Sequence, residues 1–257
     1  MGEDSDVRYE VRGQSAWLTI DREERRNALR TQTVEALHDG LCRAGADPAV
    51  RVICLTGAGN KAFCAGADLS GAGEEAEAMG LRAYADLLKA FAQSEKPLVA
   101  RVAGHCVGGG LGLMLSCDLV YAADHVKIGT PEVNVGLFPM MVAALLPRHT
   151  SRKRVLEMVF TGELVPADEA ERIGLVTRVC PANELDELVE TTLASIASKA
   201  PLAISLGRRA FYASEEMSLP TALDHLCGEL EVLVKTEDVA EGFRAFQEKR
   251  APSWTGR

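Results

Sequence analysis

A run of glycines near the middle of the chain restricts its fold more than any other feature. Residues 105–112 contain three consecutive glycines, follow the strand-like apolar residues 98–104 and lead into a helical pattern. Glycine lets the backbone turn sharply, and the first N–H groups of a helix have no partner within that helix. The sequence therefore predicts a strand-to-helix turn whose free N–H groups can hold an anion or a developing oxyanion.

A second loop of small residues, 63–69, follows the strand-like residues 51–56. Two loops of this kind can each direct one N–H group at the same carbonyl oxygen, which is the arrangement that stabilises an enolate. The nearest candidate base is Glu132, which follows Pro131 among apolar neighbours. Burial there would raise the pKa of its carboxyl group and suit it to proton transfer, whereas the alternative is an exposed loop carboxylate. Our working hypothesis is an oxyanion hole with one carboxylate.

The glycine turn allows other interpretations. Taken alone, it favours a tight turn without a ligand. A dinucleotide-binding Gly-x-Gly-x-x-Gly loop is not matched, because Leu113 stands where the last glycine after Gly108 and Gly110 belongs. A Walker loop is not matched either, because the chain lacks Gly-Lys-Ser/Thr. Together with the second small-residue loop, the glycine turn favours the interpretation as an oxyanion hole.

The composition is that of a globular protein with one large domain, or one domain and a small appendage. Its 47% apolar content can form a sizeable core, and no apolar run approaches the ~18 residues of a membrane span. The acidic residues 1–6 resemble neither a secretory signal nor a transit peptide. Seven cysteines without paired Cys-x-x-Cys spacing favour reduced thiols in the cytoplasm over disulfides or a metal site. A net charge of −9 without a basic stripe argues against a nucleic-acid partner.

The hydrophobic pattern predicts an α/β protein with a helical tail. Strands are expected in the first part of the chain, and only helices are expected after residue 182. The first two strands alternate apolar and polar residues, as a two-stranded ribbon would. The repeated strand–strand–helix order suggests a spiral of strands flanked by helices. The expected strands are residues 7–12, 16–20, 51–56, 98–103 and 119–122, and the expected helices are 31–45, 74–92, 111–116, 183–199, 202–215, 219–233 and 239–249.

Several reactive residue types near these motifs receive structural roles. His105 has no serine or cysteine partner at a recognisable spacing, so a hydrolytic triad has little support and packing or surface is expected. Cys64, Cys106 and Cys117 are expected to be small buried hydrophobes rather than nucleophiles. Asp118 is expected to anchor the start of a strand.

At these residues the chain resembles the crotonase superfamily, also called the enoyl-CoA hydratase/isomerase family. The matching segments occur in family order and extend from about Val7 to Trp254. They are residues 26–29, 63–69, 103–110, 117–119, 131–132, 161–163 and 246–250. The resemblance implies a crotonase-like ββα spiral core in residues 1–199 and a helical region in residues 200–257 that builds a homotrimer or a dimer of trimers. It further implies an acyl-CoA thioester as substrate. No separate cofactor and no metal are expected, and neither a nucleic-acid nor a membrane partner.

The resemblance also implies roles for individual residues. The oxyanion donors would be the N–H groups of Ala67 and Gly109, and Glu132 would be the catalytic acid–base group. Asp68 has an alternative structural role, in which its carboxylate bonds loop amides and fixes the turn. The residues that the resemblance places around the acyl-CoA, including the adenine pocket, are Ala28, Ala65, Gly66, Asp68, Leu69, Gly108, Gly112 and Met140.

In the family, side chains from two parts of the chain contact CoA. Arg25 and Arg26 lie where the family meets the nucleotide end of CoA, although a solvated basic pair is the alternative. Phe246 and Lys249 match positions that reach the CoA of a neighbouring subunit, and their spacing puts them on one helix face. Phe243 and Phe246 can equally be core anchors of that helix.

Two departures from the family pattern bear on the reaction. Family hydratases carry a second glutamate two residues after the third glycine, where this chain has Gly112. They also follow a Leu-Phe-Pro segment with glycines, where this chain has Met140 and two further apolar residues. A drier pocket with one carboxylate suits proton transfer on carbon better than addition of water. Family isomerases keep the later acid and have an apolar residue in place of the earlier one.

The favoured function is therefore that of an isomerase that shifts the double bond of a 3-enoyl-CoA to give a 2-enoyl-CoA through a dienolate. One alternative is a 2-enoyl-CoA hydratase of fatty-acid or related acyl-CoA catabolism that works with Glu132 alone. Another is a CoA-ester binding protein with little activity. Other crotonase reactions remain open, because one scaffold supports many chemistries.

Overall fold

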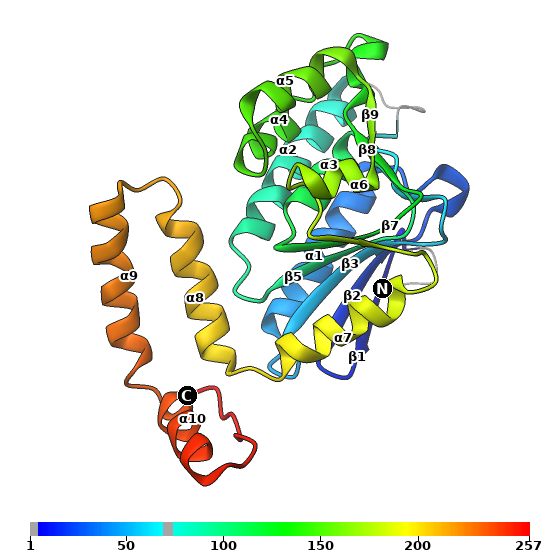
Figure 1. Ribbon diagram of the computed structural model, residues 1–257. Helices are drawn as coiled ribbons and strands as arrows, with labels where there is room; N and C mark the ends of the chain where they lie inside the picture. The colour runs from blue at the N-terminus through cyan, green and yellow to red at the C-terminus, as the bar shows by residue number, and fades with distance from the viewer. Residues whose placement is uncertain (1–4, 69–73) are drawn as a thin grey trace.

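The computed structural model describes residues 5–68 and 74–257 (Figure 1). Within these residues the strands form two β-sheets, and the last strand ends at Cys180. Helices alone follow it in the described chain. This agrees with the predicted α/β core and helical tail.

The larger sheet has the strand order β1-β2-β3-β5-β7-β10. Strands β1 and β2 form the predicted antiparallel ribbon, and the remaining neighbours are parallel. Strands β2 and β3 are buried along their whole length, as expected for strands covered on both faces. The strand bounds are β1 (Val7–Arg12), β2 (Ser15–Ile20), β3 (Val52–Gly57), β5 (Leu98–Val102), β7 (Leu119–Ala123) and β10 (Arg178–Cys180).

The smaller sheet has the order β4-β6-β8-β9 and was not predicted. Its strands β4 (Ala62–Cys64), β6 (His105–Val107), β8 (Lys127–Gly129) and β9 (Leu164–Pro166) have three residues each, too few to show an alternating pattern. Strands β4, β6 and β8 are parallel. Their carboxyl ends therefore lie at the same edge of the sheet.

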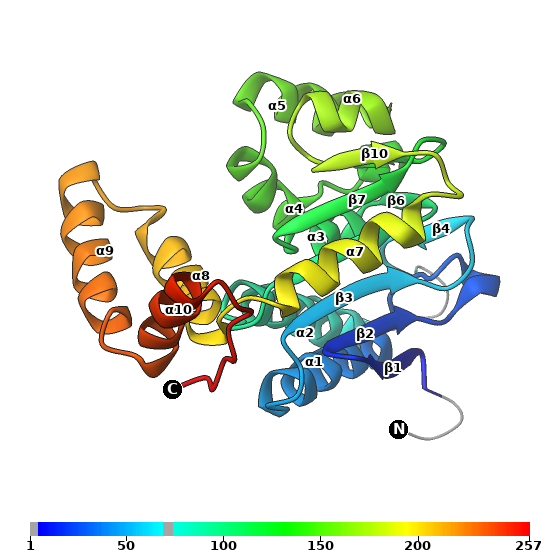
Figure 2. The same cartoon turned by 60° about the horizontal axis from the view of Figure 1, so that its bottom comes forward.

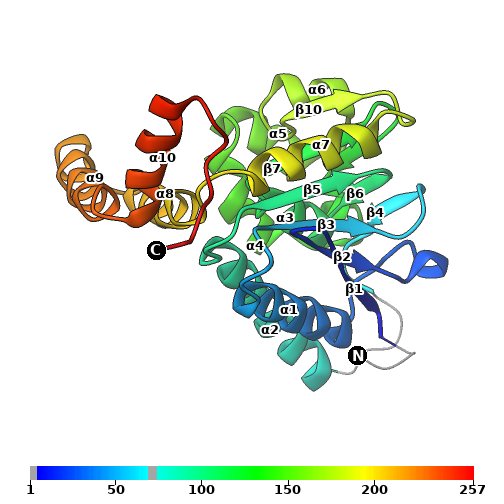
Figure 3. The ribbon, with the colours of Figure 1, turned by 90° about the horizontal axis from the view of Figure 1, so that it is seen from below.

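Helices cover both faces of the larger sheet. Figure 3 shows α1 (Thr31–Ala46) and α2 (Glu74–Ala92) on one side and α7 (Leu185–Ala197) on the other. The apolar faces of these helices meet buried strand residues such as Leu18 and Leu55 in one continuous core. Further elements surround the smaller sheet: η2 (Pro131–Val135), α3 (Gly109–Leu115), α4 (Met140–Leu145), η3 (Leu146–Arg148), α5 (Arg152–Thr161) and α6 (Ala167–Arg172).

The C-terminal arm consists of helices α8 (Pro201–Ser214), α9 (Leu219–Leu233) and α10 (Glu237–Glu248). It extends away from the sheets (Figures 1 and 2). Arg208 anchors α8 to the core through Asp118, at 2.9 Å. The arm also exposes large apolar side chains, which are Phe211, Leu219, Leu223, Leu226, Leu230, Val232, Phe243 and Phe246.

The predicted bounds of two long helices, 74–92 and 219–233, agree with the structure. The helix predicted to stop near Gly45 continues to Ala46, and Asp47 forms its C-cap in extended backbone. Gly45 does not adopt the left-handed conformation that ends many helices. In the part of the chain that the structure describes, no helix is both long and apolar enough to cross a membrane.

Candidate active site

Three loops meet at the carboxyl edge of the smaller sheet. The loop after β4 carries Gly66 and Ala67, the turn after β6 carries Gly108, and Glu132 comes shortly after β8. The Gly108 N–H group donates to the Gly129 carbonyl at 3.0 Å, which ties two of these loops together. The parallel pairing of short strands thus brings the two predicted loops and the predicted carboxylate to one place.

Gly66 makes the close approach of the first two loops possible. Its φ of +84° lies in the left-handed region, which favours glycine. A Cβ atom at this position would lie 3.2 Å from the Gly109 nitrogen and 3.2 Å from the Val107 carbonyl oxygen. The loop after β4 therefore packs against the backbone of the glycine turn.

An oxyanion hole requires N–H groups that are not already hydrogen-bonded, and the N–H groups of Ala67 and Gly109 meet this requirement among the described residues. Leu29 holds the loop on both sides of Ala67, because it donates to Gly66 O and accepts from Asp68 N, each at 2.8 Å. Gly109 is the first residue of α3, where an N–H group has no partner within the helix. Among the hydrogen bonds of the described residues, neither N–H group is a donor.

Glu132 lies beside the glycine turn. Its Oε1 atom is 3.2 Å from the position that a Cβ atom of Gly108 would occupy. The Oε2 atom is buried and has no hydrogen-bond partner among the described residues. Burial raises the pKa of the Glu132 carboxyl group above its ordinary value of 4.5. The side chain is therefore half-buried, in agreement with the expected environment.

Tyr84 of α2 is a site residue that the sequence analysis missed. Its hydroxyl group donates to the Gly109 carbonyl at 2.5 Å, and the residue is 7% exposed. A Cβ atom on Gly112 would lie 2.1 Å from the Tyr84 oxygen and 3.4 Å from a methyl carbon of Val142. The space in which a side chain of residue 112 would begin is thus filled by Tyr84 and Val142.

The titratable groups that act on Tyr84 are the thiols of Cys64 and Cys106 and the carboxyl group of Glu132. Cys64 and Cys106 are fully buried, as predicted, and burial raises the pKa of Cys64 to about 12 and that of Cys106 well above its ordinary range. Burial also raises the pKa of Tyr84 well above 10. Burial thus raises the pKa of the Glu132 carboxyl group from the acidic side, whereas the raised pKa values of the thiols and of the phenol keep these groups protonated.

His105 and Asp118 have the structural roles that were expected. His105 is exposed, and its Nδ1 atom accepts a hydrogen bond from the Lys127 N–H group at 3.0 Å. Asp118 precedes β7 and accepts from the Leu98 N–H group at 2.7 Å, so it fixes the start of the neighbouring strand.

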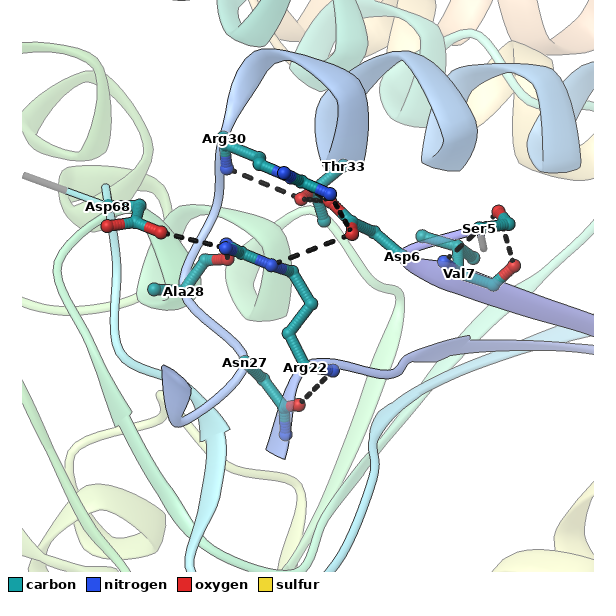
Figure 4. A network of polar contacts seen from close by, with 9 residues as sticks. All are labelled: Ser5, Asp6, Val7, Arg22, Asn27, Ala28, Arg30, Thr33 and Asp68. Carbon is teal, nitrogen blue, oxygen red and sulfur yellow. Dashed lines mark hydrogen bonds and ion pairs between the residues drawn. The ribbon is translucent and has the colours of Figure 1, made fainter. Parts of the chain in front are cut away.

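A buried ion-pair network supports the loop after β4 (Figure 4). The Arg22 guanidinium group lies 2.9 Å from Asp68 and 3.6 Å from Asp6, and it donates to the Ala28 carbonyl at 2.5 Å. Asn27 is fully buried and accepts from the Arg22 N–H group at 3.0 Å. Asp68 therefore has a structural role, as one interpretation predicted, with a guanidinium group as partner. The role of Arg22 was missed, because its partner Asp68 is 46 residues away.

The remaining predicted contacts lie at or beyond the edge of this site. Arg25 and Arg26 are exposed, and the Arg26 carbonyl accepts from the Ala65 N–H group at 3.1 Å, which places this turn beside the loop. Ala28 is buried, and Met140 is 72% exposed at the start of α4. Leu69 lies outside the described residues.

Phe246 and Lys249 are not near the glycine turn of their own chain. They lie in and directly after α10, on the C-terminal arm, well apart from α3 in all three views (Figures 1–3). Phe246 is 83% exposed, so it is not a core anchor of this helix within one chain. A contact with bound CoA would have to be made in another copy.

The fold thus brings two loops with free backbone N–H groups and one half-buried carboxylate to one edge of the smaller sheet. The sequence model of the enoyl-CoA hydratase/isomerase family matches residues 12–257. The chain belongs to this family, which lies in the crotonase superfamily.

Named relatives and solved structures agree with this membership. The chain is 36% identical over 255 residues to (E)-benzylidenesuccinyl-CoA hydratase of Thauera aromatica, covering 97% of this chain and 99% of that protein. It is 34% identical over 255 residues to carnitinyl-CoA dehydratase of Proteus mirabilis, covering 96% and 97%. The crystal structure of enoyl-CoA hydratase from Bacillus anthracis has a TM-score of 0.94 and 32% identity, covering 98% of this chain and 100% of that one.

Proposed function

We propose that this enzyme moves the double bond of an enoyl-CoA thioester, converting a 3-enoyl-CoA to a 2-enoyl-CoA. The observation that carries the proposal is that Glu132 lies beside the glycine turn, while Gly112, the position of a second carboxylate in family hydratases, faces the Tyr84 hydroxyl group. Migration of a double bond needs one base that takes a proton and returns it, whereas addition of water is served better by two acid–base groups.

In the proposed mechanism the thioester oxygen accepts hydrogen bonds from the N–H groups of Ala67 and Gly109. Glu132 removes a proton from C2, and the resulting dienolate is stabilised by these donors and by the amino end of α3. The protonated Glu132 then delivers the same proton to C4, and the double bond becomes conjugated with the thioester. Loss of one donor in such a hole costs on the order of 3 kcal/mol of activation free energy. No separate cofactor is needed, because the proton goes from carbon to Glu132 and back.

Hydration of a 2-enoyl-CoA is the second candidate. It is supported by the names of the relatives, which are a hydratase and a dehydratase. In this case Glu132 alone would have to orient and deprotonate water and also exchange the proton at the α-carbon. The apolar Val142 beside Gly112 makes the space around that position less suited to holding water.

We propose that Arg25 and Arg26 contact the phosphates of CoA and that Phe246 and Lys249 complete the site of a neighbouring copy in a homotrimer or a dimer of trimers. The exposed apolar side chains of the C-terminal arm support this assembly, because a patch of this kind is typical of an interface. Light scattering should give the mass of three or six chains. A stable, active monomer at micromolar concentration would contradict the assembly and the shared site.

The function is tested by offering the purified enzyme both 3-enoyl-CoA and 2-enoyl-CoA esters of several chain lengths. We expect faster turnover of the 3-enoyl esters. Glu132→Gln should lower kcat by about 10²–10⁴-fold with CoA-ester affinity within a few-fold, because the amide keeps the shape but cannot take the proton. Glu35→Gln, which changes an exposed carboxylate on α1, is the matched control.

Each alternative gives a different result in this assay. Rapid hydration of 2-enoyl esters without isomerisation of 3-enoyl esters would replace the proposal by the hydratase. Binding without turnover of either ester would indicate a CoA-ester binding protein. Retained activity in Glu132→Gln would show that Glu132 is not the base.

A further inference from the structure

We infer that Tyr84 is a positioning residue of the oxyanion hole, which fixes the Gly109 backbone through its hydroxyl group and excludes any side chain from position 112. The inference rests on the proposed function for the identity of the hole, and it assigns to α2 a role in catalysis. Tyr84 acts through Gly109 and is not placed in contact with the reacting atoms.

The Tyr84 hydroxyl group is bound at the oxyanion hole itself. Tyr84 donates to the carbonyl oxygen of Gly109, the same residue whose N–H group is the predicted oxyanion donor. A glycine has no side chain that packing could hold, and its backbone has wide conformational freedom. The Tyr84 hydrogen bond, 2.5 Å long and buried, removes that freedom next to the donor. The tyrosine ring also lies close, with its Cζ atom 3.7 Å from the position of a Gly109 Cβ.

Tyr84 is unsuited to proton transfer. The single hydroxyl proton is engaged by the Gly109 carbonyl. Burial, with the nearby Glu132 carboxylate adding to it, raises the pKa of Tyr84, so the phenol stays neutral and is a poor base. The Tyr84 phenol therefore contributes to catalysis by holding the Gly109 backbone and not by transferring a proton.

The Tyr84 hydroxyl group and Gly112 match each other in volume. A Cβ atom at 112 would overlap the Tyr84 oxygen at 2.1 Å but would lie 3.3 Å from its Cζ atom. The overlap is therefore with the hydroxyl group, and removal of that group leaves only a close contact with the ring. Tyr84 and Gly112 form a complementary pair across α2 and α3, in which the hydroxyl group requires a glycine opposite it.

The test uses Tyr84→Phe and reads enolate binding directly. Acetoacetyl-CoA is a suitable probe, because its enolate absorbs in the near ultraviolet and can be titrated on the enzyme without turnover. Butyryl-CoA measures binding of the ester without an enolate. We expect Tyr84→Phe to weaken enolate binding about fivefold to tenfold, the effect of one hydrogen bond. Butyryl-CoA affinity should stay within about twofold, since the ring and the CoA contacts are kept.

Turnover supplies a second readout and separates this inference from the proposed function. Tyr84→Phe should lower kcat by a similar factor at nearly unchanged KM. Tyr9→Phe is the matched control, because the Tyr9 hydroxyl group is buried without a hydrogen-bond partner among the described residues. If the wild-type enzyme fails to isomerise 3-enoyl esters, the proposed function is wrong, yet the enolate titration still decides the role of Tyr84. Equal enolate binding by Tyr84→Phe and Tyr9→Phe would overturn the inference.

Gly112→Ala probes the same contact from the other side. We expect it to lower the melting temperature in the wild-type background and to do so much less in the Tyr84→Phe background. The reason is that the 2.1 Å overlap exists only when the hydroxyl group is present. An equal loss in both backgrounds would contradict the complementary pair.

Discussion

Arg208 holds the C-terminal arm to the core, and Arg208→Met tests that attachment. The guanidinium group lies 2.9 Å from Asp118 and donates to the carbonyls of Phe91, Ala92 and Ser94. The Arg208 side chain is only 6% exposed. Methionine keeps a flexible apolar chain but has no donor, so the substitution removes these contacts with little loss of packing.

The expected loss of stability follows from the groups that the substitution leaves behind. Asp118 keeps its bonds from the Leu98 N–H group and the Tyr212 hydroxyl group but loses its cation. Removal of one partner of a buried ion pair costs about 3–5 kcal/mol. Folded domains are stable by about 5–15 kcal/mol. Arg208→Met should therefore lose a large part of the free energy of unfolding, with the arm separating first.

The chain contains two tryptophans that report on the two regions separately. Trp17 is 4% exposed in the larger sheet, and Trp254 follows the arm and donates to the Ser198 carbonyl at 2.8 Å. Urea unfolding is followed by fluorescence in Trp254→Phe and Trp17→Phe backgrounds at one protein concentration, since assembly shifts apparent stability. The Trp254 signal should change at lower urea than the Trp17 signal in Arg208→Met.

Arg209→Met is the matched control on the same helix. Its side chain is 56% exposed and has an ion pair with Glu229 at 3.4 Å, so the loss should stay below about 1 kcal/mol. If Arg208→Met loses no more stability than Arg209→Met, the buried network does not anchor the arm.

Three further predictions concern the site. Because the folded-state pKa of Glu132 is raised, its contribution to stability is present below the ordinary glutamate range and is lost as the pH rises through the raised value. Isomerase activity should rise over that same pH window. Glu132→Gln should be more stable than wild type near neutral pH but equally stable in acid. Identical unfolding curves for the variant and the wild type at both pH values would contradict this. Gly66→Ala should lose activity, and Gly13→Ala, also at positive φ but with open space around its Cβ position, should lose only about 1 kcal/mol of stability; equal activities would refute the loop contact. Gly112→Glu alone should fold poorly. Tyr84→Ala/Gly112→Glu should have higher hydratase turnover on a short 2-enoyl-CoA than Tyr84→Ala, and a double variant that folds without this gain would count against the missing-acid explanation.

Long periodic elements could be predicted from the sequence because their pattern is local. Helix α2 repeats its apolar positions over 19 residues, so its bounds follow from the sequence alone. Strands β4, β6 and β8, with three residues each, show no period, and their pairing depends on the spiral as a whole. The smaller sheet was therefore missed, although the loops it positions were found from their glycines.

The residues of the candidate site likewise divide into those with a local sequence signal and those without one. Gly109 and Glu132 could be predicted because each belongs to a short motif whose residue types suit the chemistry. Arg22 could not, because its role depends on partners from distant segments, Asp6 and Asp68. Buried arginines in such networks are rare, so a sequence pattern favours exposure for each of them.

Tyr84 and Gly112 show why the reaction is harder to predict than the site. The sequence shows that an acid is missing at position 112, but it does not show which side chain occupies the space beside this position. The structure fills that space with a neutral hydroxyl group from α2 and a methyl group of Val142. Complementary volumes on different helices leave no local pattern, because their match depends on how α2 and α3 pack. The absence of a second acid at position 112 is therefore coupled to Tyr84, which also holds the backbone of Gly109. A substitution at position 84 or 112 must change the contact between the two residues.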